Sequence, residues 1–75
     1  MTESDVVASF GLVVQRARKA AGLSQEGLAA LAALDRTYVS GLERGRRNPT
    51  LVTQARVAAA LGRPLSELFE EMETL

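Results

Sequence analysis

Side chains that can form hydrogen bonds with phosphates and base edges are concentrated in one short stretch of this 75-residue chain. Arginine can form two hydrogen bonds with guanine O6 and N7 or with a phosphate, and a threonine methyl can contact a thymine methyl. Hydroxyl and amide side chains bind phosphate oxygens. The residues that carry these groups are Arg36, Thr37, Ser40, Arg44, Arg46, Arg47 and Asn48. Together they predict binding to nucleic acid.

The charges are unevenly distributed along the chain, although the net charge is zero. Residues 36–56 hold five arginines and one acidic residue, Glu43, whereas residues 64–75 hold four glutamates and no base. One end of the molecule is therefore expected to attract phosphate and the other to repel it. The zero net charge argues against a nucleic-acid binder that is basic overall. Ordinary solvated charge that happens to segregate is the alternative explanation.

Apolar residues recur at helical spacing in five segments and none alternates as a strand would, which predicts a single all-α domain over residues 1–75. The first helix is expected at about residues 5–21, ending before Gly22, and the second is expected to start from the cap Ser24. The third is expected from the cap Asp35 to Arg44, before Gly45, and the fourth from near Thr50 to Gly62. The fifth is expected at about residues 64–72, starting at Pro64. Their apolar residues are Phe10, Val13, Val14, Ala17 and Ala21; Leu28, Ala29, Leu31 and Ala32; Val39 and Leu42; Leu51, Val52, Ala55, Ala58 and Ala59; and Leu65, Leu68, Phe69 and Met72.

The second and third helices, joined by a short turn, form a predicted helix-turn-helix motif at about residues 24–44. Leu23 precedes Leu28, and Leu34 precedes Val39, at the spacing of a hydrophobic staple, which fixes where both helices begin. A rotation of about 100° per residue places Val39 and Leu42 on one side of the third helix. The opposite side presents Arg36, Thr37, Ser40, Gly41 and Arg44.

Several short runs along the chain are typical of one family. They are Arg18, Gly22 to Glu26, Leu28-Ala29, Tyr38 to Ser40, Leu42 to Gly45, Asn48 to Thr50, Ala60 to Gly62 and Leu68-Phe69. In these the chain resembles the Cro and phage-repressor (Xre-like) helix-turn-helix regulators, and through residues 34–41 it is most similar to the controller proteins of restriction-modification systems. The resemblance implies a compact five-helix fold like that of the lambda repressor. It also implies a transcription regulator that binds operator DNA as a homodimer and that both activates and represses genes.

Individual residues are then expected to have the following roles. Arg36 and Thr37 would contact base edges, and Gln25, first in its helix, would contact a phosphate. Tyr38 would either pack against the DNA backbone or seal the domain, and the resemblance pairs Arg18 with Glu43 in a structural salt bridge. Further DNA contacts are expected from Ser40 and Asn48, from Gly41 through close approach, and from Arg44, Arg46 and Arg47, of which the last two have the alternative role of mobile surface residues.

Two residues depart from the family pattern. Ala33 stands where a turn glycine is usual, so the turn must either adopt a backbone conformation that alanine tolerates or carry modest strain. Gly27 replaces the glutamate that would complete a capping box with Ser24, so the second helix should be weaker at its start.

The fifth helix has more apolar surface than a small domain needs for its core. Leu65, Leu68, Phe69 and Met72 are therefore expected to form a two-fold dimer interface, and core closure is their alternative role. Such a dimer would place two recognition helices in successive major grooves. The expected partners are double-stranded operator DNA and a second copy of the chain, with RNA polymerase considered as a further partner.

Catalysis is not expected, because the chain lacks histidine, cysteine, metal-ligand clusters and glycine-rich phosphate loops. No cofactor or metal is therefore expected. The acidic amino-terminal residues and the lack of a long apolar run predict a soluble cytoplasmic protein without contact to a membrane. An antitoxin or another protein-binding regulator with the same fold is the alternative function.

Overall fold

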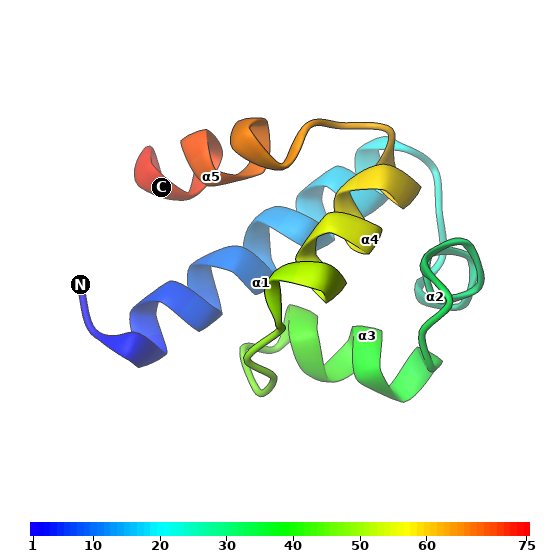
Figure 1. Ribbon diagram of the computed structural model, residues 1–75, viewed down its shortest axis with the longest axis horizontal. Helices are drawn as coiled ribbons and strands as arrows, with labels where there is room; N and C mark the ends of the chain where they lie inside the picture. The colour runs from blue at the N-terminus through cyan, green and yellow to red at the C-terminus, as the bar shows by residue number, and fades with distance from the viewer.

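A computed structural model describes all residues from Met1 to Leu75. Its five helices are α1 (Glu3–Ala20), α2 (Gln25–Ala32), α3 (Arg36–Glu43), α4 (Leu51–Leu61) and α5 (Leu65–Glu73). The long helix α1 is flanked by α5 on one side and by α3 on the other, and both chain termini lie at the same end of the molecule (Figure 1). The prediction of an all-α fold with five helices is confirmed. No helix combines the length and the apolar character needed to cross a bilayer.

Capping residues explain where the helices begin. The Thr2 hydroxyl accepts a hydrogen bond from the Asp5 N–H and the Asp5 carboxylate accepts one from the Thr2 N–H, so α1 starts two residues earlier than expected. The Thr2 backbone N–H, helped by its hydroxyl, lowers the pKa of Asp5. The Ser24 and Thr50 hydroxyls cap α2 and α4. Asp35 is the N-cap residue of α3, as expected, but its carboxylate makes no capping hydrogen bond.

The core lies where the inner faces of all five helices meet. Its buried apolar side chains are Phe10, Val13, Val14 and Ala17 of α1, Leu28, Ala29 and Ala32 of α2, Val39 and Leu42 of α3, Val57, Ala58 and Leu61 of α4, and Leu68 of α5. The expected faces of α1 and α3 are confirmed except for Ala21, which is the exposed cap residue that ends α1.

The predicted buried faces of α2 and α4 were correct only in part. Leu31 of α2 is 63% exposed, and Leu51 and Val52 of α4 are 68% and 62% exposed. In α4 the buried face consists of Val57, Ala58 and Leu61, because the helix is apolar on nearly every side and packing against α2 and α5 selects which side is covered. The sequence pattern alone gives no basis for that choice.

The turn between α2 and α3 settles the question raised by Ala33. This residue adopts the left-handed conformation, with φ 56° and ψ 46°, and it is the only residue other than glycine with positive φ. Left-handed backbone costs an L-residue about 1–2 kcal/mol. Ala33 therefore carries the strain that glycine would avoid, and the turn nevertheless forms, with the Leu34 N–H donating to the Ala29 carbonyl at 2.8 Å.

Candidate nucleic-acid interface

Helix α3 sits unusually close to α1, and Gly11 makes this possible. A β-carbon built at Gly11 would lie 2.1 Å from the carbonyl oxygen of Leu42, which no side chain can do without moving the backbone. The carboxyl-terminal end of α3 is thereby held directly against α1. Gly11 was not among the predicted site residues, although a lone glycine on the buried face of a long helix is itself a signal of close packing.

A buried ion pair holds the same end of α3. Arg18 Nε donates to Glu43 Oε2 at 2.6 Å and its Nη2 donates to Oε1 at 3.0 Å, while Nη1 donates to the Leu23 carbonyl at 2.8 Å. The hydrogen bonds to Glu43 raise the pKa of Arg18, against the effect of burial. The two side chains expected to pair thus join α1 to α3, and Glu43 is 1% exposed at its side chain.

The opposite face of α3 is polar and open to solvent. Arg36, Thr37 and Arg44 are exposed and Ser40 is half-buried. These four residues line a shallow hollow of about 150 Å³, and within it Arg44 Nε donates weakly to the Ser40 carbonyl at 3.4 Å. Two guanidinium groups and two hydroxyls are thereby grouped on one helix face with no acidic side chain among them. This is the chemistry required for contact with phosphates and base edges.

Arg47 lies over the middle of α3. Its guanidinium carbon is 5.4 Å from the centroid of the Tyr38 ring, within the range of a cation–π interaction. A β-carbon at Gly41 would be 3.1 Å from Arg47 Cγ. Gly41 is therefore buried beneath Arg47, and in this structure its missing side chain makes room for that arginine rather than leaving an open surface for DNA. The expected close approach of DNA to Gly41 stays a prediction, and it would require the Arg47 side chain to move aside.

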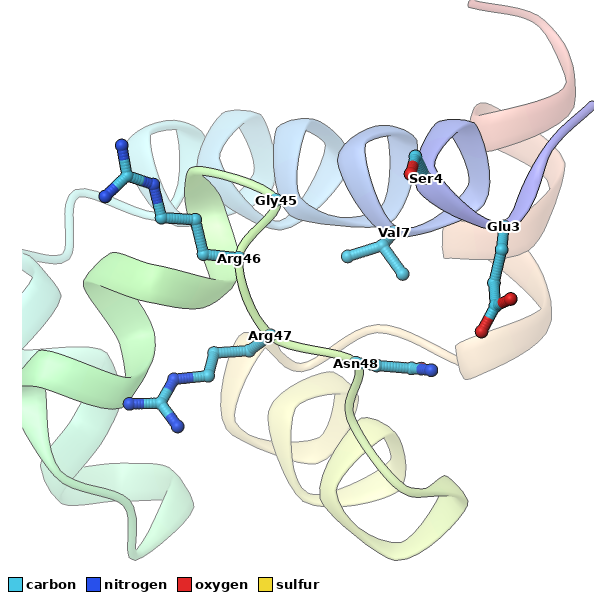
Figure 2. A pocket seen from close by; sticks show the side chains of 7 residues that line it. All are labelled: Glu3, Ser4, Val7, Gly45, Arg46, Arg47 and Asn48. Atoms are coloured by element: carbon cyan, nitrogen blue, oxygen red, sulfur yellow. The ribbon is translucent and has the colours of Figure 1, made fainter.

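The side chains of Arg46, Arg47 and Asn48, in the loop after α3, point in two directions (Figure 2). Glu3, Ser4, Val7, Gly45, Arg46, Arg47 and Asn48 line a hollow of about 250 Å³ between this loop and the start of α1. Figure 2 shows Arg46 and Arg47 pointing away from this hollow, with Arg47 toward α3, while Asn48 points to the side where Glu3 lies. The two arginines thus extend the basic surface of α3, and Asn48 points away from it, toward the side of the hollow that Glu3 lines (Figure 2).

Gln25 is the first residue of α2 and is half-buried. Its Nε2 donates to Glu43 Oε1 at 3.1 Å. Gln25, which was expected to contact a phosphate, is thus hydrogen-bonded to the buried ion pair, and the sequence did not suggest this bond. The Ser24 hydroxyl accepts from the Gly27 N–H at 2.9 Å. No return bond comes from Gly27, which has no side chain to give one.

Helix α5 presents only part of its apolar face to solvent. Leu68 is 0% exposed and belongs to the core, so it has no surface to offer a second subunit, and its assignment to a dimer interface was wrong. Leu65 and Met72 are half-buried against the core, and Phe69 is 39% exposed, with its ring centroid 6.3 Å from that of Phe10. A hollow of about 220 Å³ beside them is lined mostly by apolar residues: Val6, Val7, Phe10, Pro49, Phe69 and Met72, with Asn48 and Gln54.

The acidic residues of α5 are partly neutralised. Arg63, just before the helix, pairs with Glu67 at 2.9 Å and with Glu71. These hydrogen bonds, that of Glu71 above all, raise the pKa of Arg63. The separation of charge seen in the sequence is preserved, because this cluster lies on α5, whereas four arginines without an ion pair, Arg36, Arg44, Arg46 and Arg47, lie on α3 and directly after it.

The two helices of the motif and the polar face of α3 define a helix-turn-helix protein, and the chain belongs to the helix-turn-helix family, whose profile matches residues 14–68. Control protein C.MunI of Mycoplasma sp is 45% identical over 71 residues, which cover 93% of this chain and 96% of that protein. The solved structure of the restriction-modification controller protein C.AhdI from Aeromonas hydrophila is 49% identical, with a TM-score of 0.82 over 84% of this chain and 96% of that one.

A second solved structure contains DNA. It is the tetramer of the restriction-modification controller protein C.Esp1396I in complex with its natural 35 base-pair operator. That protein is 32% identical to this chain, with a TM-score of 0.85 over 92% of this chain and 91% of that one. The resemblance to controller proteins seen in the sequence is confirmed by these relatives.

Proposed function

We propose that this chain is a sequence-specific transcription regulator that binds operator DNA as a homodimer and controls restriction and modification genes, as activator and repressor, in the cytoplasm. The observation that carries the proposal is the acid-free polar face of α3, with Arg36, Thr37, Ser40 and Arg44 grouped around one hollow. The names of C.MunI, C.AhdI and C.Esp1396I, and the operator bound by the last of them, support it.

We expect different residues of this surface to contact bases and phosphates. Arg36 and Thr37 lie at the amino end of α3, where a recognition helix contacts base edges in the major groove. Gln25, at the start of α2 beside Glu43, and Ser40, in the middle of α3, would donate to phosphates, which sets the register without selecting the sequence. The guanidinium groups that remain, on Arg44, Arg46 and Arg47, would neutralise further phosphates along the groove.

The dependence of binding on salt tests the proposed contacts with phosphate. If each subunit neutralises about four phosphates, the association constant of the dimer should fall with a slope near −7 in log K against log salt. Arg46→Ala should make this slope shallower by about one for each subunit and weaken binding to all sequences alike. The measurement is fluorescence anisotropy of a labelled duplex at several salt concentrations. A slope near zero would contradict the contact set.

Selection of bound duplexes from a random pool tests the contacts with bases. The recovered sites should contain two related half-sites whose centres lie about 10 base pairs apart. Arg36→Ala should relax the preference at one position in each half-site, at a cost of about 1–3 kcal/mol there. Recovery of sites without any common sequence would refute sequence-specific binding.

The exposed apolar residues support a homodimer built on α5. Phe69 is 39% exposed at the edge of the hollow of about 220 Å³, and Met72 lines the same hollow. In sedimentation equilibrium the protein should have twice the 8.0 kDa mass of one chain. Phe69→Lys should yield the single-chain mass. Leu31→Lys is the matched control, because Leu31 is 63% exposed on α2, and it should leave the mass unchanged.

RNA polymerase is the partner that the activating role would require. Purified regulator and polymerase should form a joint complex on a promoter fragment that contains the selected site. An antitoxin would behave differently, because a second polypeptide would co-purify with the chain at stoichiometric ratio.

A further inference from the structure

The buried ion pair has a third member, Gln25, which is itself a proposed phosphate contact. Glu43 Oε1 accepts from Arg18 Nη2 at 3.0 Å and also from Gln25 Nε2 at 3.1 Å, while Oε2 accepts from Arg18 Nε at 2.6 Å. Every buried side-chain nitrogen and oxygen in the structure has a hydrogen-bond partner. Glu43 therefore links α1, through Arg18, to the first residue of α2.

The contact with Glu43 restricts the Gln25 carboxamide to one orientation. A carboxylate only accepts hydrogen bonds, so the NH2 group of Gln25 must face Glu43 and the amide oxygen must face elsewhere. One of the two amide hydrogens is used by Glu43, and the second stays free to donate. Gln25 is only half-buried, and it stands at the end of α2 where backbone N–H groups also lack helical partners.

The charge of Glu43 is compatible with a nearby phosphate only because Arg18 neutralises it. An unpaired carboxylate within a few ångströms of a phosphate would repel it and would be costly to bury. The two hydrogen bonds from Arg18 hold both oxygens of the carboxylate, and Glu43 is 1% exposed at its side chain. The pair is therefore a neutral, fixed acceptor behind the phosphate contact.

We propose that Glu43 is a positioning residue for DNA binding, which orients the Gln25 carboxamide so that its free N–H donates to a backbone phosphate. This inference rests on the proposed function. It assigns to Glu43 a second role beside joining α1 to α3, since the same carboxylate that fixes α3 also fixes the side chain at the start of α2. Phosphate binding at Gln25 and the position of the recognition helix are then coupled through one group.

A double-mutant cycle on a duplex selected from a random pool tests the coupling. Gln25→Ala should lower the association constant of the otherwise unchanged protein about tenfold, which corresponds to about 1.4 kcal/mol. In the Glu43→Gln background the same change should cost less than about twofold, because position 43 then offers a single acceptor oxygen, which Arg18 occupies, and the amide at position 25 is no longer held. Ser40→Ala is the matched control, since Ser40 is also a proposed phosphate contact but makes no side-chain hydrogen bond with Glu43. Its cost should be equal in both backgrounds.

Equal costs of Gln25→Ala in the two backgrounds would overturn the inference, because they would mean that Glu43 acts on stability alone. The proposed function would survive that result. If the unaltered protein binds no duplex from the pool, the proposed function fails and the inference fails with it. All affinities are measured well below the melting temperature of each variant, so that loss of folded protein does not enter the comparison.

A measurement on the unaltered protein covers the case in which Glu43→Gln does not fold. The chain has three glutamines, so their side-chain amides can be resolved in a ¹⁵N-labelled sample. One amide proton of Gln25 should exchange slowly in the free protein because it is bonded to Glu43. The other should shift when the selected duplex is added, and the amide of Gln15 serves as the control. Fast exchange of both Gln25 protons, or no shift of either with DNA, would overturn the inference.

Discussion

Replacing Ala33 by glycine should stabilise the protein, although the substitution removes atoms from the structure. Ala33 is exposed and holds a left-handed backbone with φ 56° and ψ 46°. That conformation costs alanine about 1–2 kcal/mol. Glycine has greater conformational freedom in the unfolded chain, which lowers the free energy of unfolding by about 0.4–1 kcal/mol. The net gain should be about 1 kcal/mol. In a domain of this size it corresponds to a rise in melting temperature of about 4–8 °C.

The reverse substitution is available as a control within the same chain. Gly22 and Gly62 have φ of 73° and 68°, and a β-carbon at either would meet nothing within 4 Å. Gly22→Ala and Gly62→Ala should therefore lower the melting temperature by a similar amount through backbone strain alone. Melting is followed by circular dichroism at one fixed protein concentration, because association shifts the transition. If the two controls destabilise while Ala33→Gly leaves the melting temperature unchanged or lower, the strain assigned to Ala33 is refuted.

Two further substitutions test the contacts that fix α3. Arg18→Ala should leave the buried Glu43 carboxylate unpaired and lower the free energy of unfolding, measured in urea, by about 3–5 kcal/mol. Arg63→Ala is the control and should lower it by less than about 1 kcal/mol, because the partners of Arg63 on α5 are half exposed. Equal costs of the two substitutions would show that burial of the pair is unimportant. Gly11→Ala should lower the free energy of unfolding by at least about 2 kcal/mol in the same assay, because the new methyl would displace the Leu42 carbonyl, and a neutral result would mean that α1 and α3 separate easily.

The helix boundaries were largely predictable because local chemistry determines them. Glycine at positive φ follows α1, α3 and α4 as expected, and Ser24 and Thr50 are caps. The missed start of α1 was also local, since Thr2 and Asp5 have the spacing of a capping box. The buried face of α4 was not predictable, because its sequence is apolar on nearly every side and the neighbouring helices decide which side is covered.

The outer face of α3 followed from helical rotation alone, but two contacts within the candidate site did not. Arg47 lies over Tyr38 and Gly41 because of the path of the loop after α3, which no periodic pattern describes. Gln25 contacts Glu43 because α2 and α3 pack against each other. Both contacts depend on how elements meet in space. Residue types and their spacing identify the candidates for such contacts but leave their partners open.

The two ends of α3 are held by different means, and this difference separates folding from recognition. At the carboxyl end, Leu42 touches Gly11 and Glu43 is paired with Arg18, so substitutions there disturb the packing of α1 against α3. At the amino end, Arg36 and Thr37 are exposed and make no side-chain hydrogen bond within the chain. Surface substitutions of that kind usually change stability by less than about 0.5 kcal/mol. Residues at the amino end can therefore vary to suit different operators while the scaffold that presents them stays intact.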